Sequence, residues 1–140
     1  MHSYFSGHIK GLNINRLFKE EGIMDFNDNK PIYLQLADQL MDATERPGFT
    51  AGGRLPSVRE YAASTGVNAN TVMRTYTWLQ QEEIIFNKRG IGYFYSDNAK
   101  ELVFKMRRQQ FFDKEMPHFV KRMKALEVSL QEFEKFYSEI

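Results

Sequence analysis

The 140-residue sequence predicts an α+β fold, in which three short helices precede a β-hairpin and further helices form a tail. Two observations support this prediction. Apolar residues recur at helical spacing over most of the chain after residue 30, and the spacing changes to a strand-like pattern only near residues 84–95. Clusters of glycine and proline separate the patterned segments. Hydrophobic residues make up 42% of the chain, which is enough for a packed core.

The chain divides into three expected regions. Residues 1–23 show no sustained period, and Met24 stands directly before the patterned part, so we expect a leader that is non-native or disordered. Residues 24–96 carry the helices and the hairpin and are expected to form one domain. Residues 97–140 are expected to form a short all-α tail.

The first helix is expected from Pro31, because proline suits the first position of a helix. One face of this helix is apolar, and a loop rich in glycine and proline follows at residues 45–53. The expected inner face consists of Tyr33, Leu36, Ala37, Leu40 and Met41.

The next two helices are expected to be separated by a tight turn. Ser57 and Glu60 have the spacing of a capping box, in which each side chain accepts a hydrogen bond from the backbone of the other. Gly66 is expected to end this helix, and Asn68 is expected to cap the next one, which runs to about Glu83. Its apolar face is formed by Val72, Tyr76 and Leu79.

A β-hairpin and the tail complete the chain. Residues 84–86 and 93–95 are rich in β-forming residues, and a basic, glycine-rich tip lies between them. In the tail we expect three short helices. Pro117 is expected to interrupt the chain between the first and the second, and Ser129 with Glu132 forms a capping box at the start of the third.

Composition excludes several functions. The chain has no cysteine, which rules out disulfides, a thiol nucleophile and thiolate metal sites. No apolar run approaches the ~20 residues of a membrane span, and the first residues lack the apolar stretch of a signal peptide, so we expect a cytoplasmic protein without a membrane partner. We find no nucleophile–base–acid set and no phosphate loop, so we do not expect an enzyme, a cofactor or a metal site.

The predicted order of helix, loop, helix, turn, helix and hairpin is that of a winged helix-turn-helix domain. Such a domain places one helix in the major groove of DNA, while other segments hold the phosphates. Net charge is only +1 for the whole chain, but residues 54–92 hold five basic and three acidic side chains. The candidate DNA contacts near the helix starts and the hairpin tip are Arg54, Ser57, Arg59, Asn68, Asn70, Thr71, Arg74, Lys88, Arg89 and Gly90.

The stretch RLPSVREYAASTGVNANTVMRTYTWLQQEEIIFNKRGIGYF resembles the DNA-binding domain of the GntR family of bacterial regulators. The resemblance lies in the Pro-Ser-x-Arg-Glu segment, the Gly-Val turn, the small polar start of the third helix and the basic-Gly-x-Gly wing. It implies that Arg59 is a principal DNA contact and that Arg89 and Gly90 enter the minor groove. It also implies that Asn68, Asn70 and Thr71 approach bases and phosphates. Ala69 departs from the family, because many members carry a basic residue there that reads a guanine.

The short tail is similar to that of the YtrA-like subfamily, which implies dimerisation. Six of the twelve phenylalanines lie in the tail, and three short helices cannot bury that many rings alone. We therefore expect a homodimeric repressor that occludes a two-fold operator in duplex DNA. The expected dimer interface consists of Leu102, Val103, Met106, Phe111, Phe112, Phe119, Met123 and Phe133.

Two other readings of the tail stay open. The winged helix could serve as a protein-interaction module, with the tail as its working surface. Alternatively, the tail could sense a small-molecule effector of unknown identity in an apolar cavity.

Overall fold

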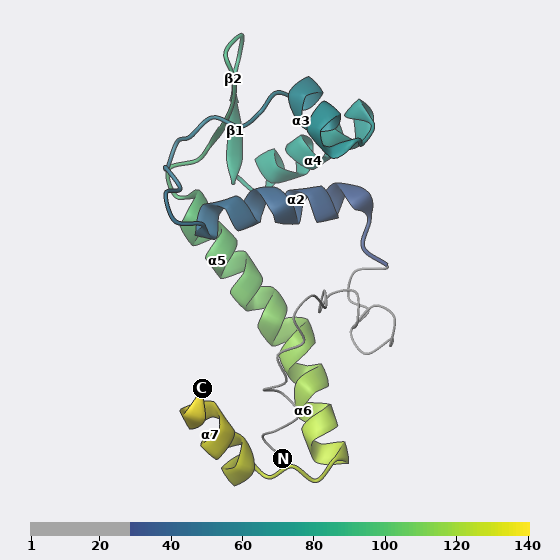
Figure 1. Cartoon of the computed structure of the whole chain (residues 1–140), viewed down its shortest axis with the longest axis vertical. Helices are drawn as coiled ribbons and strands as arrows, with labels where there is room; N and C mark the ends of the chain where they lie inside the picture. Colours follow the sequence, from purple (N-terminus) through teal and green to yellow (C-terminus); the bar gives the residue numbers. More distant parts are fainter. Residues whose placement is uncertain (1–28) are drawn as a thin grey trace, which may run out of the picture.

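Residues 29–140 are described by the structure, which is a computed structural model of the chain. The predicted leader at residues 1–23 lies outside the described residues. The described chain forms a head and a long tail that leaves it on one side (Figure 1). The head contains α2 (Ile32–Asp42), the 3-10 helix η2 (Ala43–Glu45), α3 (Val58–Thr65), α4 (Ala69–Gln81), β1 (Ile85–Lys88) and β2 (Gly92–Tyr95). The tail contains α5 (Ala99–Gln110), the π-helical segment η3 (Phe111–Glu115), α6 (Met116–Ala125) and α7 (Leu130–Glu139).

The head has one apolar core, to which every one of its main helices contributes. Helix α4 packs against both α2 and α3. The predicted inner faces of α2 and α4 are buried except for Tyr33, which is partly exposed. A buried threonine joins two helices: Thr75 Oγ1 donates a hydrogen bond to Tyr33 O at 2.9 Å, which links α4 to the first turn of α2. The buried apolar residues are Leu36, Ala37, Leu40, Met41, Leu55, Tyr61, Val72, Tyr76, Leu79, Ile84, Ile85, Tyr95, Ala99 and Val103.

The predicted helix-turn-helix is present between α3 and α4. Ser57 Oγ accepts a hydrogen bond from Glu60 N at 3.1 Å, as a helix cap does. Gly66 ends α3 in the left-handed conformation, with a φ of 68° that glycine adopts without strain. Asn68 Oδ1 then accepts from Asn70 N at 2.8 Å and begins α4. The α+β winged-helix fold class is confirmed.

The wing is an antiparallel pair of strands that receives a third segment from the preceding loop. Strand β1 begins one residue later than predicted and reaches Lys88, while Ile84 lies buried in the turn before it. Leu55 N donates to Tyr93 O at 2.9 Å, and Tyr95 N donates to Gly53 O at 2.8 Å. The end of the loop that sequence analysis left unpatterned therefore pairs with β2 and holds the wing against the head.

Two predictions about the tail were wrong. Pro117 does not separate two helices, because α5, η3 and α6 follow one another as a single rod (Figure 1). Met116 N donates to Phe111 O, which is the wider hydrogen-bond pattern of a π turn. We infer that this wider turn absorbs the clash that a proline ring makes with the preceding turn of an α-helix. Val103, expected at a dimer interface, is instead fully buried in the core of the head, so it has no surface to offer a partner.

Candidate nucleic-acid interface

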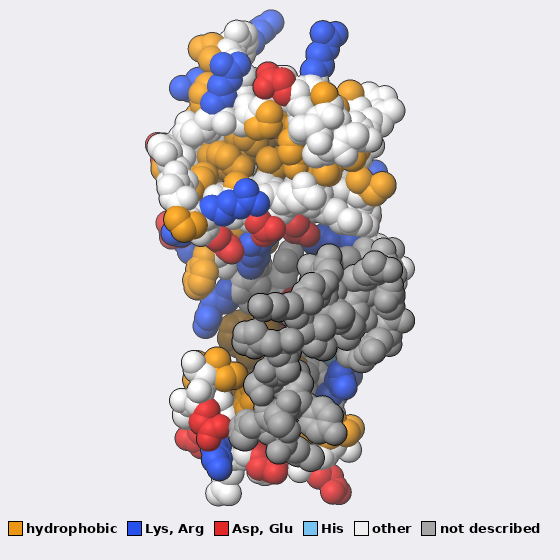
Figure 2. Space-filling model, in the orientation of Figure 1, with side chains coloured by type: hydrophobic (Ala, Val, Ile, Leu, Met, Phe, Trp, Pro, Cys, Tyr) orange, Lys and Arg blue, Asp and Glu red, His pale blue; other side chains and the backbone are white. Residues whose placement is uncertain are grey.

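The predicted DNA contacts gather at the end of the head that lies opposite the tail. The wing and the start of α3 rise above α2 in Figure 1. Figure 2 shows Lys and Arg side chains standing out at this end, over the wing and over α3. A surface with projecting cations at helix starts and at a hairpin tip is suited to a phosphate backbone.

Arg59 lies in the first turn of α3 and is exposed. Within residues 29–140 it makes no hydrogen bond and no ion pair, and the same holds for Arg89. Asp38, an acid that could have held Arg59, is instead bound by Lys30. All ion pairs of the described residues lie away from α3, α4 and the wing. The guanidinium groups of Arg59 and Arg89 are therefore available to bind an external anion.

The first turn of α4 presents small polar side chains. Ala69 and Asn70 are exposed and Thr71 is half-buried, while the Asn68 side chain is engaged in capping the helix. Asn70 offers both a donor and an acceptor, the pattern that pairs with adenine. Ala69 offers neither, so no hydrogen bond to a base comes from that position.

Arg74 is held in place by an aromatic ring that sequence analysis assigned to the core. Its guanidinium carbon lies 4.0 Å from the centre of the Tyr33 ring, which is partly exposed at the start of α2. A cation over an aromatic face is stabilised and restricted in its rotamers. The sequence pattern does not indicate this role of Tyr33, because the two residues are far apart in the chain and only the packing of α2 on α4 brings them together.

The Arg54 side chain packs against the turn of the wing and supports it. One of its terminal nitrogens donates to Ile91 O at 2.9 Å, and its side chain lies so close to Gly92 that a Cβ there would stand 3.2 Å from Nε. The arginine is still exposed, so it can contact DNA while it supports the tip. Its place beside the wing, rather than beside α3, is a feature that spacing did not reveal.

The tip of the wing is shorter than predicted. Lys88 belongs to β1, and its ammonium lies 4.7 Å from the Phe94 ring centre, on the face where Phe86 and Phe94 stack. Ile91 N donates to Lys88 O at 2.9 Å and closes the turn. Gly90 has a φ of 78°, which a residue with a side chain seldom adopts. Arg89 and Gly90 thus form the projecting end, and Lys88 is drawn back along the strand.

Buried tyrosines hold the segments of this surface together. The Tyr76 hydroxyl donates to Pro56 O at 2.6 Å, directly before the Ser57 cap, and the Tyr95 hydroxyl donates to Leu40 O at 2.8 Å. Burial raises the pKa of Tyr76 well above its usual value of 10 and raises the pKa of Tyr95 to about 12. Both phenols therefore stay neutral donors at physiological pH.

Two kinds of site are not found among the described residues. Residues 29–140 hold no group of three or more His, Asp or Glu side chains placed to bind a metal ion. No helix in this part of the chain is long and apolar enough to cross a membrane.

Comparison with known proteins finds relatives that share the head of this chain. The family described as "Bacterial regulatory proteins, gntR family" matches residues 32–94, which span the head from α2 to β2. An uncharacterised HTH-type transcriptional regulator of Bacillus subtilis, YhcF, is 40% identical over 110 residues, which cover 76% of this chain and 87% of that protein. The B. subtilis HTH-type transcriptional repressor YtrA is 39% identical over 77 residues, covering 55% of this chain and 59% of YtrA. A crystal structure of a transcriptional regulator of the GntR family from Bacteroides thetaiotaomicron has a TM-score of 0.67 and 45% identity, covering 78% of this chain and 95% of that one.

Proposed function

Because the chain belongs to the GntR family of bacterial regulatory proteins, which are DNA-binding transcription regulators and not enzymes, we propose that it is a sequence-specific, homodimeric repressor. In this proposal the dimer sits on a two-fold operator and occludes a promoter. The name of one relative, a transcriptional repressor, supports the direction of regulation. A regulator of this kind works where the chromosome lies, so we place it in the cytoplasm.

The observation that carries DNA binding is that Arg59 and Arg89, at the outer end of the head, have no partner within residues 29–140. We propose that Arg59 binds the DNA backbone or a base edge beside the start of α3. Helix α4 would enter the major groove with Asn70, Thr71 and Arg74 toward the bases. Arg89 and Gly90 would reach the neighbouring minor groove from the wing tip. Ala69 would make the operator differ from those in which a basic residue reads a guanine at that position.

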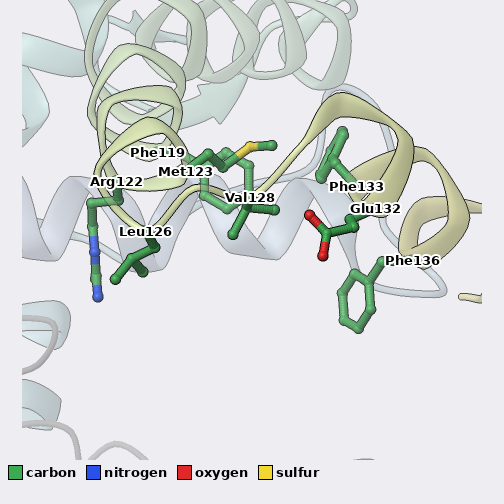
Figure 3. Close-up of a pocket in the computed structure, with 8 residues that line it drawn as sticks. All are labelled: Phe119, Arg122, Met123, Leu126, Val128, Glu132, Phe133 and Phe136. Atoms are coloured by element: carbon green, nitrogen blue, oxygen red, sulfur yellow. The ribbon is translucent and has the colours of Figure 1, made fainter.

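The observation that supports a dimer is the exposure of the tail. No residue of η3, α6 or α7 is buried, although these elements carry many large apolar side chains. A hollow of about 430 Å³ opens between α6 and α7, with Phe119 and Met123 on one side and Phe133 and Phe136 on the other (Figure 3). Apolar surface of this extent on a short helical tail is typical of an interface between subunits.

A small-molecule sensor is the second candidate. The hollow has a volume within the usual range for ligand sites, and its lining is apolar apart from Arg122 and Glu132. We favour the dimer, because the apolar surface continues well beyond the hollow to side chains such as Leu130 and Tyr137. In a dimer that leaves the hollow open, the two functions are compatible.

The test combines DNA binding with molecular mass. We expect a gel shift with the region upstream of the protein's own gene, weakening steeply as salt rises, because phosphate contacts release counterions. Sedimentation velocity should show a dimer. Leu126 lines the hollow and is 68% exposed, so Leu126→Asp should yield a folded monomer with weaker DNA binding. Failure to shift any upstream sequence at low salt would favour a protein-interaction module, and a wild-type monomer would exclude the two-fold mode.

A further inference from the structure

Arg107 joins the tail to the head at the point where the tail departs. It lies on α5 one helical turn after the buried Val103, so both side chains face the head. One guanidinium nitrogen donates to Asp42 Oδ1 at 2.6 Å and the other to Glu45 Oε1 at 2.7 Å. The first of these also lies 3.4 Å from Asp38 O. One side chain thus binds three groups on α2 and η2, which we call the Arg107 clamp.

The clamp differs from an ordinary surface ion pair. The Arg107 side chain is only 28% exposed, and partial burial disfavours its charge, yet the hydrogen bonds to Asp42 and Glu45 outweigh this and raise its pKa. By contrast, the Lys105–Glu101 pair lies within α5, with side chains 68% and 62% exposed. An exposed pair of that kind contributes little and does not touch the head. The two pairs provide a test residue and a matched control on the same helix.

A small rotation at the clamp would produce a large displacement at the far end of the rod. Beyond Arg107 the rod continues through η3 and α6 with no buried residue. From Arg107 to the end of α6 is a length of roughly 27 Å at the rise of an α-helix. A rotation of about 10° at the clamp would shift the far end by about 5 Å, whereas one base pair rises only ~3.4 Å. A loose joint at Arg107 would therefore displace the far end of α6, relative to the head, by more than the rise of one base pair.

We propose that Arg107 is a positioning residue that sets the spacing between operator half-sites accepted by the dimer. The inference rests on the proposed function, in which two tails meet and each carries one head to a half-site. The clamp fixes the angle between head and rod, so both recognition helices arrive with a defined separation. The residue touches no DNA, and it acts on specificity through geometry.

The experiment uses the full-length protein and a duplex that the wild-type chain enriches from a random-sequence library. From this duplex a series is made in which the two half-sites are moved apart or together by single base pairs, together with a duplex that keeps one half-site. Fluorescence anisotropy gives the Kd of wild type, Arg107→Gln, Arg107→Lys and the control Lys105→Gln for every duplex.

Wild type and Lys105→Gln should show one sharp optimum of spacing. For Arg107→Gln we expect the preference for this optimum over a spacing one base pair longer to fall at least about fivefold, or ~1 kcal/mol. Arg107→Lys, which keeps a charge but loses the fork of two donors, should lie between them. The affinity for the duplex with a single half-site should not change. An unfolded or weakened head would bind this duplex less tightly as well, so the half-site duplex is the control for an intact head.

Other results would refute either the two-fold operator or the role of Arg107. A wild-type protein without a spacing optimum would refute the two-fold operator, and the inference about Arg107 with it. A sharp wild-type optimum that Arg107→Gln retains unchanged would refute the role of Arg107 alone. If Arg107→Gln does not fold, the double variant Asp42→Asn, Glu45→Gln removes the same clamp from the exposed side, and the same broadening is then required of it.

Discussion

Arg59→Ala is the sharpest test of how the head binds DNA. The side chain lies in the first turn of α3, is exposed and has no partner among residues 29–140. Its removal takes away no hydrogen bond, ion pair or ring contact within the described head. The free energy of unfolding should therefore stay within ~0.5 kcal/mol of wild type, as for most surface substitutions.

The expected loss of affinity follows from the kind of contact that an unpaired arginine makes. A good arginine contact to a base is worth about 1–3 kcal/mol. A dimer makes the contact twice, so even the lower value gives about 2 kcal/mol, or roughly 30-fold in Kd. If Arg59 binds a phosphate instead, the plot of log K against log salt should become shallower by about 1 for each protomer, and the loss should be similar on all sequences.

The assay is a titration of operator DNA at several salt concentrations, with urea unfolding of the same samples. Lys105→Ala serves as the control, because it also removes one exposed positive charge but lies on α5, away from the proposed interface. Arg59 is not a DNA contact if Arg59→Ala binds as tightly as wild type, or if it loses no more affinity than Lys105→Ala.

Three further predictions concern the tyrosines of the head. Tyr76→Phe leaves Pro56 O without its buried donor and should lower the free energy of unfolding by about 1–3 kcal/mol in urea titrations; an unchanged midpoint would contradict this. Tyr95 has a pKa of about 12 in the folded chain against 10 when exposed. Its contribution to the free energy of unfolding is therefore complete below pH 10 and is lost as pH rises toward 12. Circular dichroism at graded pH should show this loss, and Tyr95→Phe should reduce it. Tyr33→Leu removes the ring beneath Arg74 and should weaken DNA binding about two- to fivefold. In a protein that already carries Arg74→Ala, Tyr33→Leu should cause no further loss of affinity.

Much of the head was predictable because its signals are local. The Asn68 cap, the left-handed Gly66 and the helical period each act within a few residues, so the helix-turn-helix follows from neighbouring positions. Pro117 misled the prediction for the opposite reason. A single proline reads as a break, but the π turn before it changes the hydrogen-bond pattern and lets the rod continue.

The residues of the candidate interface were chosen from the sequence, and their role in DNA binding stays a prediction. Their arrangement in space was not predictable. The composition of helix starts and of the hairpin tip identified the arginines and Asn70. It did not show that Arg54 supports the wing at Ile91, or that Lys88 lies back over Phe94. The first contact depends on the pairing of the loop with β2, and the second depends on the register of β1 with β2.

The sequence alone established the order of elements, the winged-helix class and the charged residues at the head's outer end, since each depends on spacing along the chain. Tertiary packing decided which of these residues are buried and which have partners within the head. It buried Val103 in the core and placed Tyr33 beneath Arg74. It also brought Arg107 against Asp42 and Glu45, more than sixty residues earlier in the chain. The physical reason is that burial and ion pairing depend on distance in space, which a pattern of neighbours along one chain does not contain.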